Sequence, residues 1–364
     1  MATVSIQRSQ ARRVPTQNDD VTPSGSAAPL VFRNAVVLKK STRWQWEKET
    51  TGLDDAELRK QLQSKGLNVN EMLENDRKQK NAVREIVSRL EQAGIPTRVV
   101  SRAELQEVRD QADIIISAGG DGTFLTAAAL VNDNTPIIGI NTDPVGSEGH
   151  LCVGGKAPPN DLIEQLIAGK LKWSRRSRIR VTVKDAARRC QPKKSTTNLA
   201  LNEVFIGEDE AAKVSTYNIS IDDSPSVKQK SSGLIVTTGT GSTSWYLGMN
   251  RVDESTVTSI LEVMKSMAVK VPSNKNFVTA ITKKYNEKIP FEPDHPNFAF
   301  SIREPIFNGT FKRTATKGYA RKIKLESRCT NGFLVLDGSN KIPFPRGSVA
   351  TLEIFDSDSL TTVI

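Results

Sequence analysis

A short apolar strand that passes through two glycines into a helix is the feature of this sequence that most restricts its fold. Residues 113–125 contain three consecutive isoleucines, then Gly119 and Gly120, and then an Ala- and Leu-rich helical stretch from Thr123 onward. Such a turn directs unpaired backbone N–H groups and the positive end of the helix dipole at one point, which favours phosphate. Asp121 lies in this turn, and its carboxylate would repel phosphate unless it accepts a proton from an attacking hydroxyl or works with a cation. The turn therefore predicts phosphoryl transfer; the alternative is a turn whose Asp only caps the helix.

The length and charge of the chain indicate two domains and a small anionic ligand. A chain of 364 residues is too long for one small core. The formal net charge of +10 suits polyanions, nucleic acid included. Aromatic residues make up only 5% of the chain, and no basic motif with interleaved aromatics matches a nucleic-acid module, so small phosphorylated ligands are favoured.

The few cysteines and histidines exclude several kinds of site. Cys152, Cys190 and Cys329 are an odd and scattered set, which argues against a disulfide framework and a zinc site and fits a reducing compartment. His150 and His295 are the only histidines, so a histidine-based triad or metal centre is disfavoured. The chemistry must depend on carboxylates, backbone amides and a cation brought by the substrate.

The N-terminal segment has a composition that allows two interpretations. Residues 1–30 are polar, contain Arg8, Arg12 and Arg13, and have no acidic residue before Asp19. This is the composition of a mitochondrial transit peptide, and a disordered basic tail is the alternative. No run of 18 apolar residues is present, so no membrane span is expected.

Strands and helices alternate in the first part of the chain, which predicts a parallel sheet with crossover helices. Strands are expected near residues 35–38, 97–100, 113–117 and 136–140, with helices over 53–63 and 71–93. Ligands of such sheets bind at the carboxyl ends of the strands. The glycine turn and Asn141 would both lie there.

After about residue 150 the pattern changes to the alternation of half-buried strands. Ile179, Val181 and Val183 alternate with polar residues, and similar stretches recur up to residue 355. Only residues 161–168 and 252–286 have helical character in this part. We therefore predict an α/β domain over residues 31–150 and a mainly-β domain over residues 151–364.

Two further motifs of the second half could bind a nucleoside. Asn202 and Glu203 open an apolar strand, where an amide and a carboxylate suit a base and a ribose hydroxyl; by itself the pair is more simply a solvated turn. The loop Thr237–Tyr246 follows the apolar run Leu234–Val236 and is rich in glycine and hydroxyl groups. It could wrap a ribose, a phosphate or an adenine edge, and a flexible linker is the alternative.

Together the three motifs resemble those of the NAD kinases. The corresponding residues are Gly119–Thr123, Asn202-Glu203 and Thr240–Thr243, with Gly139-Ile140-Asn141 at the family's Gly-Ile-Asn stretch. The match extends over most of residues 31–356. It implies a Rossmann-like α/β domain followed by a β-sandwich-like domain.

Other stretches resemble the mitochondrial branch of this family. They are Arg43-Trp44, Asn141–Leu151, Ala200–Glu208, Lys228–Leu234, Phe300–Ile306 and Val335–Gly338. This resemblance favours the transit peptide for residues 1–30 and implies a protein of the mitochondrial matrix.

The resemblance also implies a role for each motif residue. Asp121 would accept the proton of the adenosine-ribose 2′-hydroxyl of NAD, which attacks the γ-phosphate of ATP to give NADP. Phosphates and the nucleotides would be bound by Gly119, Gly120, Gly122, Thr123, Asn141, Asn202, Glu203, Thr240, Gly241, Ser242, Thr243 and Ser244. Mg²⁺ would accompany ATP, and a homodimer is implied.

Three departures from the family pattern affect the acceptor site. Ser232 stands where many members have Asp, so a carboxylate contact to the nicotinamide end is not implied. Gly239 replaces a proline and should loosen its loop. The later Pro-His-Ser motif of the family is absent from the sequence.

Some residues of this chain invite more than one interpretation. Arg175, Arg176, Arg178 and Arg180 could clamp phosphate, but their alternation with apolar residues favours a solvated strand face. Asp337-Gly338 fits a hairpin turn. His150 is more simply a structural residue than a substrate contact.

Two rival functions are compatible with the glycine turn. A lipid kinase of the diacylglycerol or sphingosine type would share it but would not be expected to have the second and third motifs. A non-catalytic dinucleotide sensor would gain little from a carboxylate at Asp121.

Overall fold

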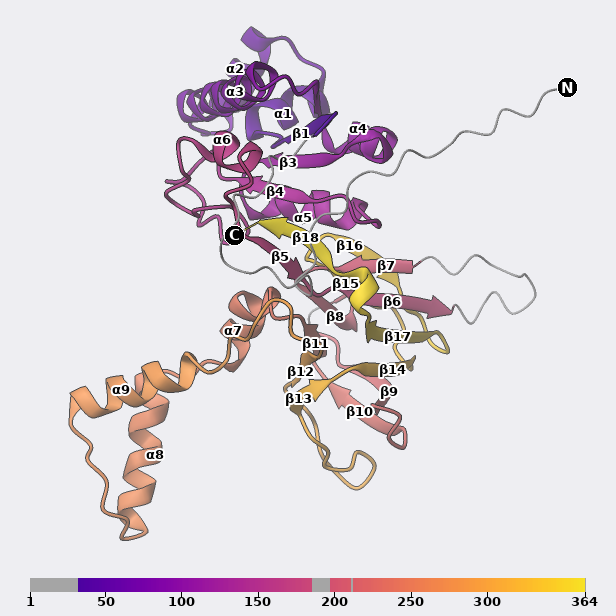
Figure 1. Cartoon of the computed structure of the whole chain (residues 1–364). Helices are drawn as coiled ribbons and strands as arrows, with labels where there is room; N and C mark the ends of the chain where they lie inside the picture. Colours follow the sequence, from indigo (N-terminus) through magenta and orange to yellow (C-terminus); the bar gives the residue numbers. More distant parts are fainter. Residues whose placement is uncertain (1–31, 185–196, 211, 364) are drawn as a thin grey trace, which may run out of the picture.

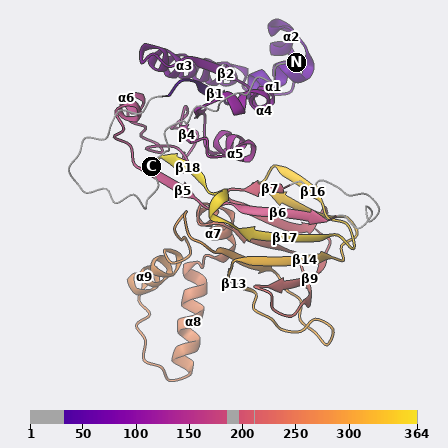
Figure 2. The ribbon, with the colours of Figure 1, turned by 45° about the vertical axis from the view of Figure 1, so that its right-hand side comes forward.

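The computed structural model describes residues 32–184, 197–210 and 212–363. The expected leader, residues 1–30, and Cys190 lie outside these ranges. Within them the chain forms an α/β layer structure and a β-sandwich that lie against each other, with a helical hairpin extending from the sandwich (Figures 1 and 2).

The first sheet has six strands, four of them from the predicted α/β region. In spatial order they are β2 (Thr97–Val100), β1 (Ala35–Lys39), β3 (Ile114–Ala118), β4 (Ile137–Ile140), β18 (Leu360–Val363) and β5 (Trp173–Arg176). The strands from β2 to β18 run parallel, and β5 is antiparallel to β18. All five residues of β3 are buried, as expected for a central strand covered on both faces.

Helices cover both faces of this sheet. The helices are α1 (Arg43–Thr51), α2 (Asp55–Ser64), α3 (Val69–Gln92), α4 (Arg102–Val108), α5 (Asp121–Leu130) and α6 (Leu162–Ile167). Successive side chains of the strands point to opposite faces of the sheet. One face packs against α3 and α6, and the other packs against α4 and α5. The sequence predicted α2, α3 and α6 closely. It missed α1, whose residues include few apolar side chains and no helical periodicity.

Two six-stranded antiparallel sheets form the second part. One contains β10 (Val227–Ser231), β9 (Ser215–Ile221), β14 (Lys322–Ser327), β17 (Val349–Ile354), β6 (Ile179–Lys184) and β7 (Thr197–Ala200). The other contains β13 (Lys317–Ala320), β12 (Phe298–Arg303), β11 (Gly233–Thr237), β8 (Glu203–Glu208), β15 (Gly332–Leu336) and β16 (Asn340–Pro343). One continuous core joins the facing sides of the two sheets, which makes this part a β-sandwich. The predicted fold class is confirmed.

Three helices interrupt the sandwich after β11. They are α7 (Trp245–Asn250), α8 (Glu254–Ser266) and α9 (Lys275–Asn286). The last two pack against each other through a small core of their own and extend away from the body (Figure 2). None of the helices in the described ranges combines the length and the apolar content that crossing a bilayer requires.

The division into domains differs from the expected boundary at residue 150. Helix α6 and strand β5 belong to the first sheet, although they lie in the range expected to be mainly β. Strand β18 also returns from the far end of the chain and lies between β4 and β5. Sequence periodicity indicates a strand but not its neighbours, because strand pairing is non-local. The first layer structure therefore needs residues from both ends of the chain.

We predict that truncating one side chain of β18 destabilises the whole fold. Leu360 is fully buried against α5 residues in the first domain's core, so Leu360→Ala should lower the free energy of unfolding by about 2–5 kcal/mol. Ser357→Ala, at an exposed position just before the strand, should change it by less than about 0.5 kcal/mol. Urea denaturation followed by circular dichroism measures both. A loss below about 1 kcal/mol for Leu360→Ala would contradict the role of β18.

Candidate active site

The predicted glycine turn lies between β3 and α5, at the carboxyl end of the central strand. A Cβ on Gly119 would overlap the Thr123 side chain, and one on Gly120 would overlap Ser147. Gly120 is the N-cap residue of α5. A larger residue at either position would have to displace these side chains, and the helix starts with its N–H groups at this end of the sheet.

Asp121 is held in place by backbone amides of the loop that follows β4. Its Oδ1 accepts a hydrogen bond from the Leu151 amide at 2.8 Å, and its Oδ2 accepts one from the His150 amide at 3.1 Å. Asn141 in turn shapes this loop, because its Nδ2 donates to the carbonyls of Ser147 and Gly155, each at 3.1 Å. Both donors of the Asn141 amide are thus used inside the loop. Asp121 is oriented by main-chain groups and keeps further acceptor capacity on each oxygen.

The Asp337 carboxylate fixes the backbone of the predicted Asn-Glu pair. Its carboxylate accepts hydrogen bonds from the backbone N–H groups of Leu201 at 2.9 Å, Asn202 at 2.7 Å and Glu203 at 3.2 Å. The Asp337-Gly338 dipeptide does form the turn between β15 and β16, and Asp337 has a φ of 48°. Sequence reasoning identified only the turn, since nothing local in an Asp-Gly pair reveals an acceptor for a distant strand.

Glu203 is a buried carboxylate whose pKa is raised. Its side chain is 7% exposed, and Ser244 Oγ lies 3.5 Å from its Oε2. Burial, and then the nearby charge of Asp337, raise the pKa of Glu203 to about 7. Both charge states of this group are therefore accessible near neutral pH.

The third motif is hydrogen-bonded to the second. Thr238 Oγ1 donates to the Leu201 carbonyl at 2.5 Å, and Thr237 Oγ1 donates to the Asn202 carbonyl at 3.1 Å. Ser242 is fully buried and accepts a hydrogen bond from the Phe291 amide at 3.1 Å, so this hydroxyl supports the loop from inside. Thr243 and Ser244 lie at the exposed side of the same loop.

Gly239 does not loosen this loop as expected. A Cβ at this position would overlap the backbone carbonyl of Glu292, and the residue is buried. Glycine is needed here because another segment of main chain packs directly against it. The expectation of a looser loop was wrong.

Two of the four arginines near residue 178 are buried, which contradicts the expected solvated strand face. Arg178 is 1% exposed and donates to the carbonyls of Ala128, Val131 and Asp358. Arg176 is 8% exposed, and its Nη1 donates to Thr240 Oγ1 at 3.3 Å. The alternation failed because the chain leaves one sheet at Arg176 and enters another at Ile179.

Arg176 connects the first and third motifs. Burial lowers its pKa, and the charge of Asp121 acts in the opposite direction, so the two side chains are close enough to interact electrostatically. Since the same guanidinium binds Thr240, Asp121 and the hydroxyl-rich loop face a common region between the domains.

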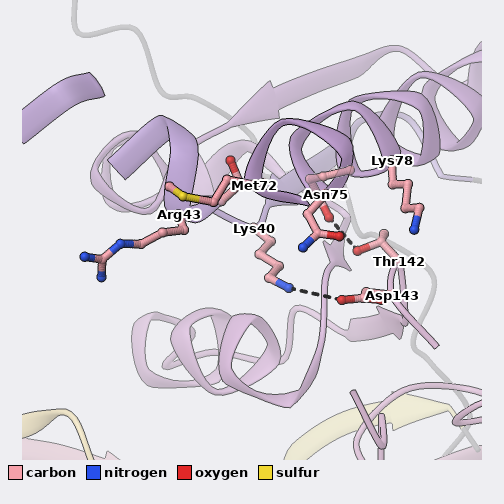
Figure 3. Close-up of a pocket in the computed structure, with 9 residues that line it drawn as sticks. Lys40, Arg43, Met72, Asn75, Lys78, Thr142 and Asp143 are labelled. Carbon is pink, nitrogen blue, oxygen red and sulfur yellow. Dashed lines mark hydrogen bonds and ion pairs between the residues drawn. The ribbon is translucent and has the colours of Figure 1, made fainter. Parts of the chain in front are cut away.

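A cavity of about 210 Å³ opens beside the glycine turn (Figure 3). It is lined by Lys40, Thr42, Arg43, Met72, Asn75, Lys78, Gln79, Thr142 and Asp143. Lys40 reaches toward Asp143, 3.9 Å from its carboxylate, and the Lys40 backbone amide donates to the Ala118 carbonyl. The cavity thus adjoins the end of β3. Sequence reasoning missed it because its lining comes from three separate segments, near residues 40–43, 72–79 and 142–143.

The described residues offer no preformed metal centre and no activated thiol. Within these ranges no three His, Cys, Asp or Glu side chains gather where they could hold a metal ion. Burial raises the pKa of Cys152 to about 12, which keeps its thiol protonated behind the glycine turn. The carboxylates and amides remain as the reactive groups.

This arrangement defines a class of protein. A glycine turn at a helix N-terminus, with an oriented carboxylate, faces a hydroxyl-rich loop on a β-sandwich across a domain junction. These are the parts of a two-domain nucleotide-binding phosphotransferase.

Comparisons with known proteins identify the family. Residues 37–171 match the ATP-NAD kinase N-terminal domain, and residues 201–292 match the ATP-NAD kinase C-terminal domain. The mitochondrial NAD kinase 2 of Rattus norvegicus is 35% identical over 93% of this chain and 90% of its own length. That of Homo sapiens is 34% identical over 93% and 86%. The chain belongs to the NAD kinase family.

Solved structures agree at the level of the fold. The NAD kinase from Archaeoglobus fulgidus in complex with ATP aligns with a TM-score of 0.53 at 20% identity, covering 91% of this chain and 93% of that one. Yeast NADH kinase complexed with NADH aligns with a TM-score of 0.58 at 13% identity, covering 93% and 84%. The lipid-kinase and sensor interpretations receive no support from these comparisons.

We predict that Gly239→Ala disrupts the site. The added methyl group must displace the Glu292 carbonyl, so overpacking should lower the free energy of unfolding by about 1–3 kcal/mol and reduce NADP formation. Gly248→Ala is the matched control, because nothing lies within 4 Å of its Cβ position in α7. Thermal unfolding and an NADP assay measure both variants. Equal behaviour of the two would contradict the close packing at Gly239.

The raised pKa of Glu203 predicts a pH dependence of stability. The folded protein holds this proton up to about pH 7, whereas the unfolded chain releases it near 4.5. The contribution of Glu203 to the free energy of unfolding is therefore largest below about pH 4.5, and it declines as the pH rises through about 7. Glu203→Gln cannot ionise, so its stability relative to the wild type should increase by about 2–3 kcal/mol between pH 5 and 8.

The measurement is urea unfolding of the ligand-free protein at several pH values. The exposed Glu91→Gln serves as control and should run parallel to the wild type. A stability difference between Glu203→Gln and the wild type that stays constant over this pH range would show that Glu203 is not the group responsible.

Proposed function

We propose that this chain phosphorylates NAD to NADP with ATP as donor and Asp121 as proton acceptor. The oxygen of the adenosine-ribose 2′-hydroxyl attacks the γ-phosphorus, its bond to the γ-phosphorus forms, and the bond from that phosphorus to ADP breaks. The hydroxyl proton passes to the Asp121 carboxylate, and ADP leaves. Membership of the NAD kinase family supports the reaction.

One observation carries the assignment of the base. Two backbone amides fix the Asp121 carboxylate at the N-terminus of α5, so it is oriented before any substrate binds. A base must lie within hydrogen-bond reach of the proton it removes, and an oriented carboxylate meets this need at little entropic cost.

The nucleotides would occupy the region between the two domains. The amides of Gly119, Gly120, Gly122 and Thr123 would bind phosphate at the start of α5. Asn202 Oδ1 is buried and accepts no hydrogen bond from the described residues, which suits an amino group of the substrate. Glu203 and Ser244 would bind ribose hydroxyls next to it. The cavity with Lys40 and Lys78 would receive the anionic phosphate donor.

Mg²⁺ would enter with ATP. The described residues hold no acidic cluster to retain a free ion, and magnesium is usually bound by one or two carboxylates together with substrate phosphates. When bound with ATP, it would supply positive charge that offsets the charge of the phosphates. Asp121 and Asp143 are the acidic side chains placed beside the turn and the cavity.

The relatives and the resemblance support two inferences, one on location and one on assembly. The relatives named above are mitochondrial, and we infer that this chain supplies NADP in the mitochondrial matrix, with residues 1–30 as transit peptide. We also infer a homodimer. Cell fractionation and size-exclusion chromatography with light scattering test these inferences separately.

The reaction is tested with purified protein, NAD, ATP and Mg²⁺. The wild type should form NADP, and Asp121→Asn should lower kcat by about 10²–10⁴-fold, since the variant cannot accept the proton. Asp110→Asn, at a side chain that is 79% exposed, is the control and should keep kcat within about twofold of the wild type. No NADP from the wild type, or undiminished NADP from Asp121→Asn, would refute the mechanism.

A further inference from the structure

Arg176 is a buried cation that forms no ion pair with any described residue. Its only side-chain hydrogen bond in the described part of the molecule goes to Thr240 Oγ1, a neutral acceptor. Its Nε is buried and has no hydrogen-bond partner. No carboxylate of the described residues lies within 4.0 Å of its guanidinium.

Arg178, two residues further along the chain, is a buried arginine whose guanidinium has several hydrogen-bond acceptors. Its guanidinium reaches three carbonyl oxygens, two of them at the C-terminal end of α5, where a helix offers unpaired acceptors and negative partial charge. Both arginines are almost fully buried. The lack of partners at Arg176 is therefore specific to its position and not a property of this segment.

An unsatisfied buried guanidinium is costly for folding. Removing such a group from water costs several kcal/mol unless an opposite charge and hydrogen-bond acceptors compensate. Arg176 is paired with Leu360 in the sheet, and an apolar residue at position 176 would avoid this cost. A buried charge that the fold leaves uncompensated in a site is a candidate for ligand binding.

The position of Arg176 indicates which anion it meets. Arg176 is the last residue of β5, the strand of the first sheet that lies next to the sandwich (Figure 1). Asp121 lies close enough to act on its charge, and Thr240 belongs to the loop assigned to the acceptor nucleoside. A substrate hydroxyl that is hydrogen-bonded to Asp121 would lie roughly 3 Å from its carboxylate. The phosphorus that this hydroxyl attacks would lie roughly a further 3–3.5 Å from the hydroxyl oxygen.

We propose that the Arg176 guanidinium contacts the γ-phosphoryl group during its transfer and neutralises the charge that develops on it. This proposal rests on the proposed function. Arg176 neither donates nor accepts a proton in this step. The P–O bond to ADP breaks as the bond from the γ-phosphorus to the 2′-oxygen forms, and the hydroxyl proton goes to Asp121. The planar guanidinium can donate two parallel hydrogen bonds to phosphoryl oxygens, which an ammonium cannot.

A purely structural role is the alternative. Arg176 could simply tie the sandwich loop to the first sheet through Thr240. In that case substitution would lower stability and weaken nucleotide binding, with KM rising. A contact made in the transition state predicts a fall in kcat with KM unchanged.

The experiment compares Arg176→Gln and Arg176→Lys with Arg175→Gln as control. Arg175 is the exposed neighbour in β5, and among the described residues its side chain bonds only the Asp356 carbonyl. Steady-state NADP formation at saturating ATP, Mg²⁺ and NAD gives kcat, and substrate titrations give both KM values. Calorimetric binding of NAD and thermal unfolding report on the ground state and the fold.

The expected result is a fall in kcat of about 10²–10³-fold for Arg176→Gln, the loss typical of one removed transition-state donor. Its NAD affinity and both KM values should stay within about threefold of the wild type, and Arg176→Lys should fall about tenfold. Arg175→Gln should match the wild type. A third variant, Arg176→Ala, leaves space for a free guanidinium ion, and added guanidinium should restore part of its activity.

Other outcomes overturn the proposal. It fails if kcat of Arg176→Gln stays within about threefold of the wild type, or if the loss lies in KM and NAD affinity instead. If Arg176→Gln does not fold, the test uses Arg176→Lys instead. A kcat of Arg176→Lys within threefold of the wild type then refutes the contact between Arg176 and the phosphoryl group. A wild type that forms no NADP refutes the proposed function itself, which separates the two failures.

Discussion

The hydrogen bonds of the buried Arg178 join the three parts of the chain that must meet for a site to exist. Its guanidinium donates to carbonyls at the end of α5, in the first domain, and to Asp358, just before β18. Arg178 itself precedes β6 of the sandwich. Positive charge at the C-terminal end of α5 complements the helix dipole, while the opposite end of the same helix presents Asp121. The domain junction and the phosphate turn are thereby fixed relative to each other through one helix.

Main-chain amides orient both acidic centres of the site. His150 and Leu151 hold Asp121, and the three N–H groups around Asn202 hold Asp337. Such groups cannot change rotamer, so the site is arranged before substrate binds and little reorganisation is needed during reaction. The two centres differ in purpose. Asp121 faces the phosphate turn, whereas Asp337 shapes the start of the Asn-Glu strand and adds to the burial that raises the pKa of its neighbour Glu203.

The sequence predicted those features that depend on neighbouring residues. The turn through Gly119 and Gly120 was recognisable because strand, glycines and helix are consecutive, and the fold class followed from periodicity. The roles of Arg176, Arg178 and Asp337 were not recognisable, since their partners lie far away in the sequence and only packing brings them together. Gly239 was misjudged for the same reason: the Glu292 carbonyl that demands a glycine there belongs to another segment.

Strand β18 has a consequence for the order in which the protein is made. During synthesis β4 emerges long before Leu360–Val363, so the first sheet must wait with one strand edge unpaired while the entire sandwich is translated. At ~5–20 residues per second this interval lasts roughly tens of seconds. An exposed apolar edge, with Ile137 and Ile138 in it, is prone to pairing with other chains during that time.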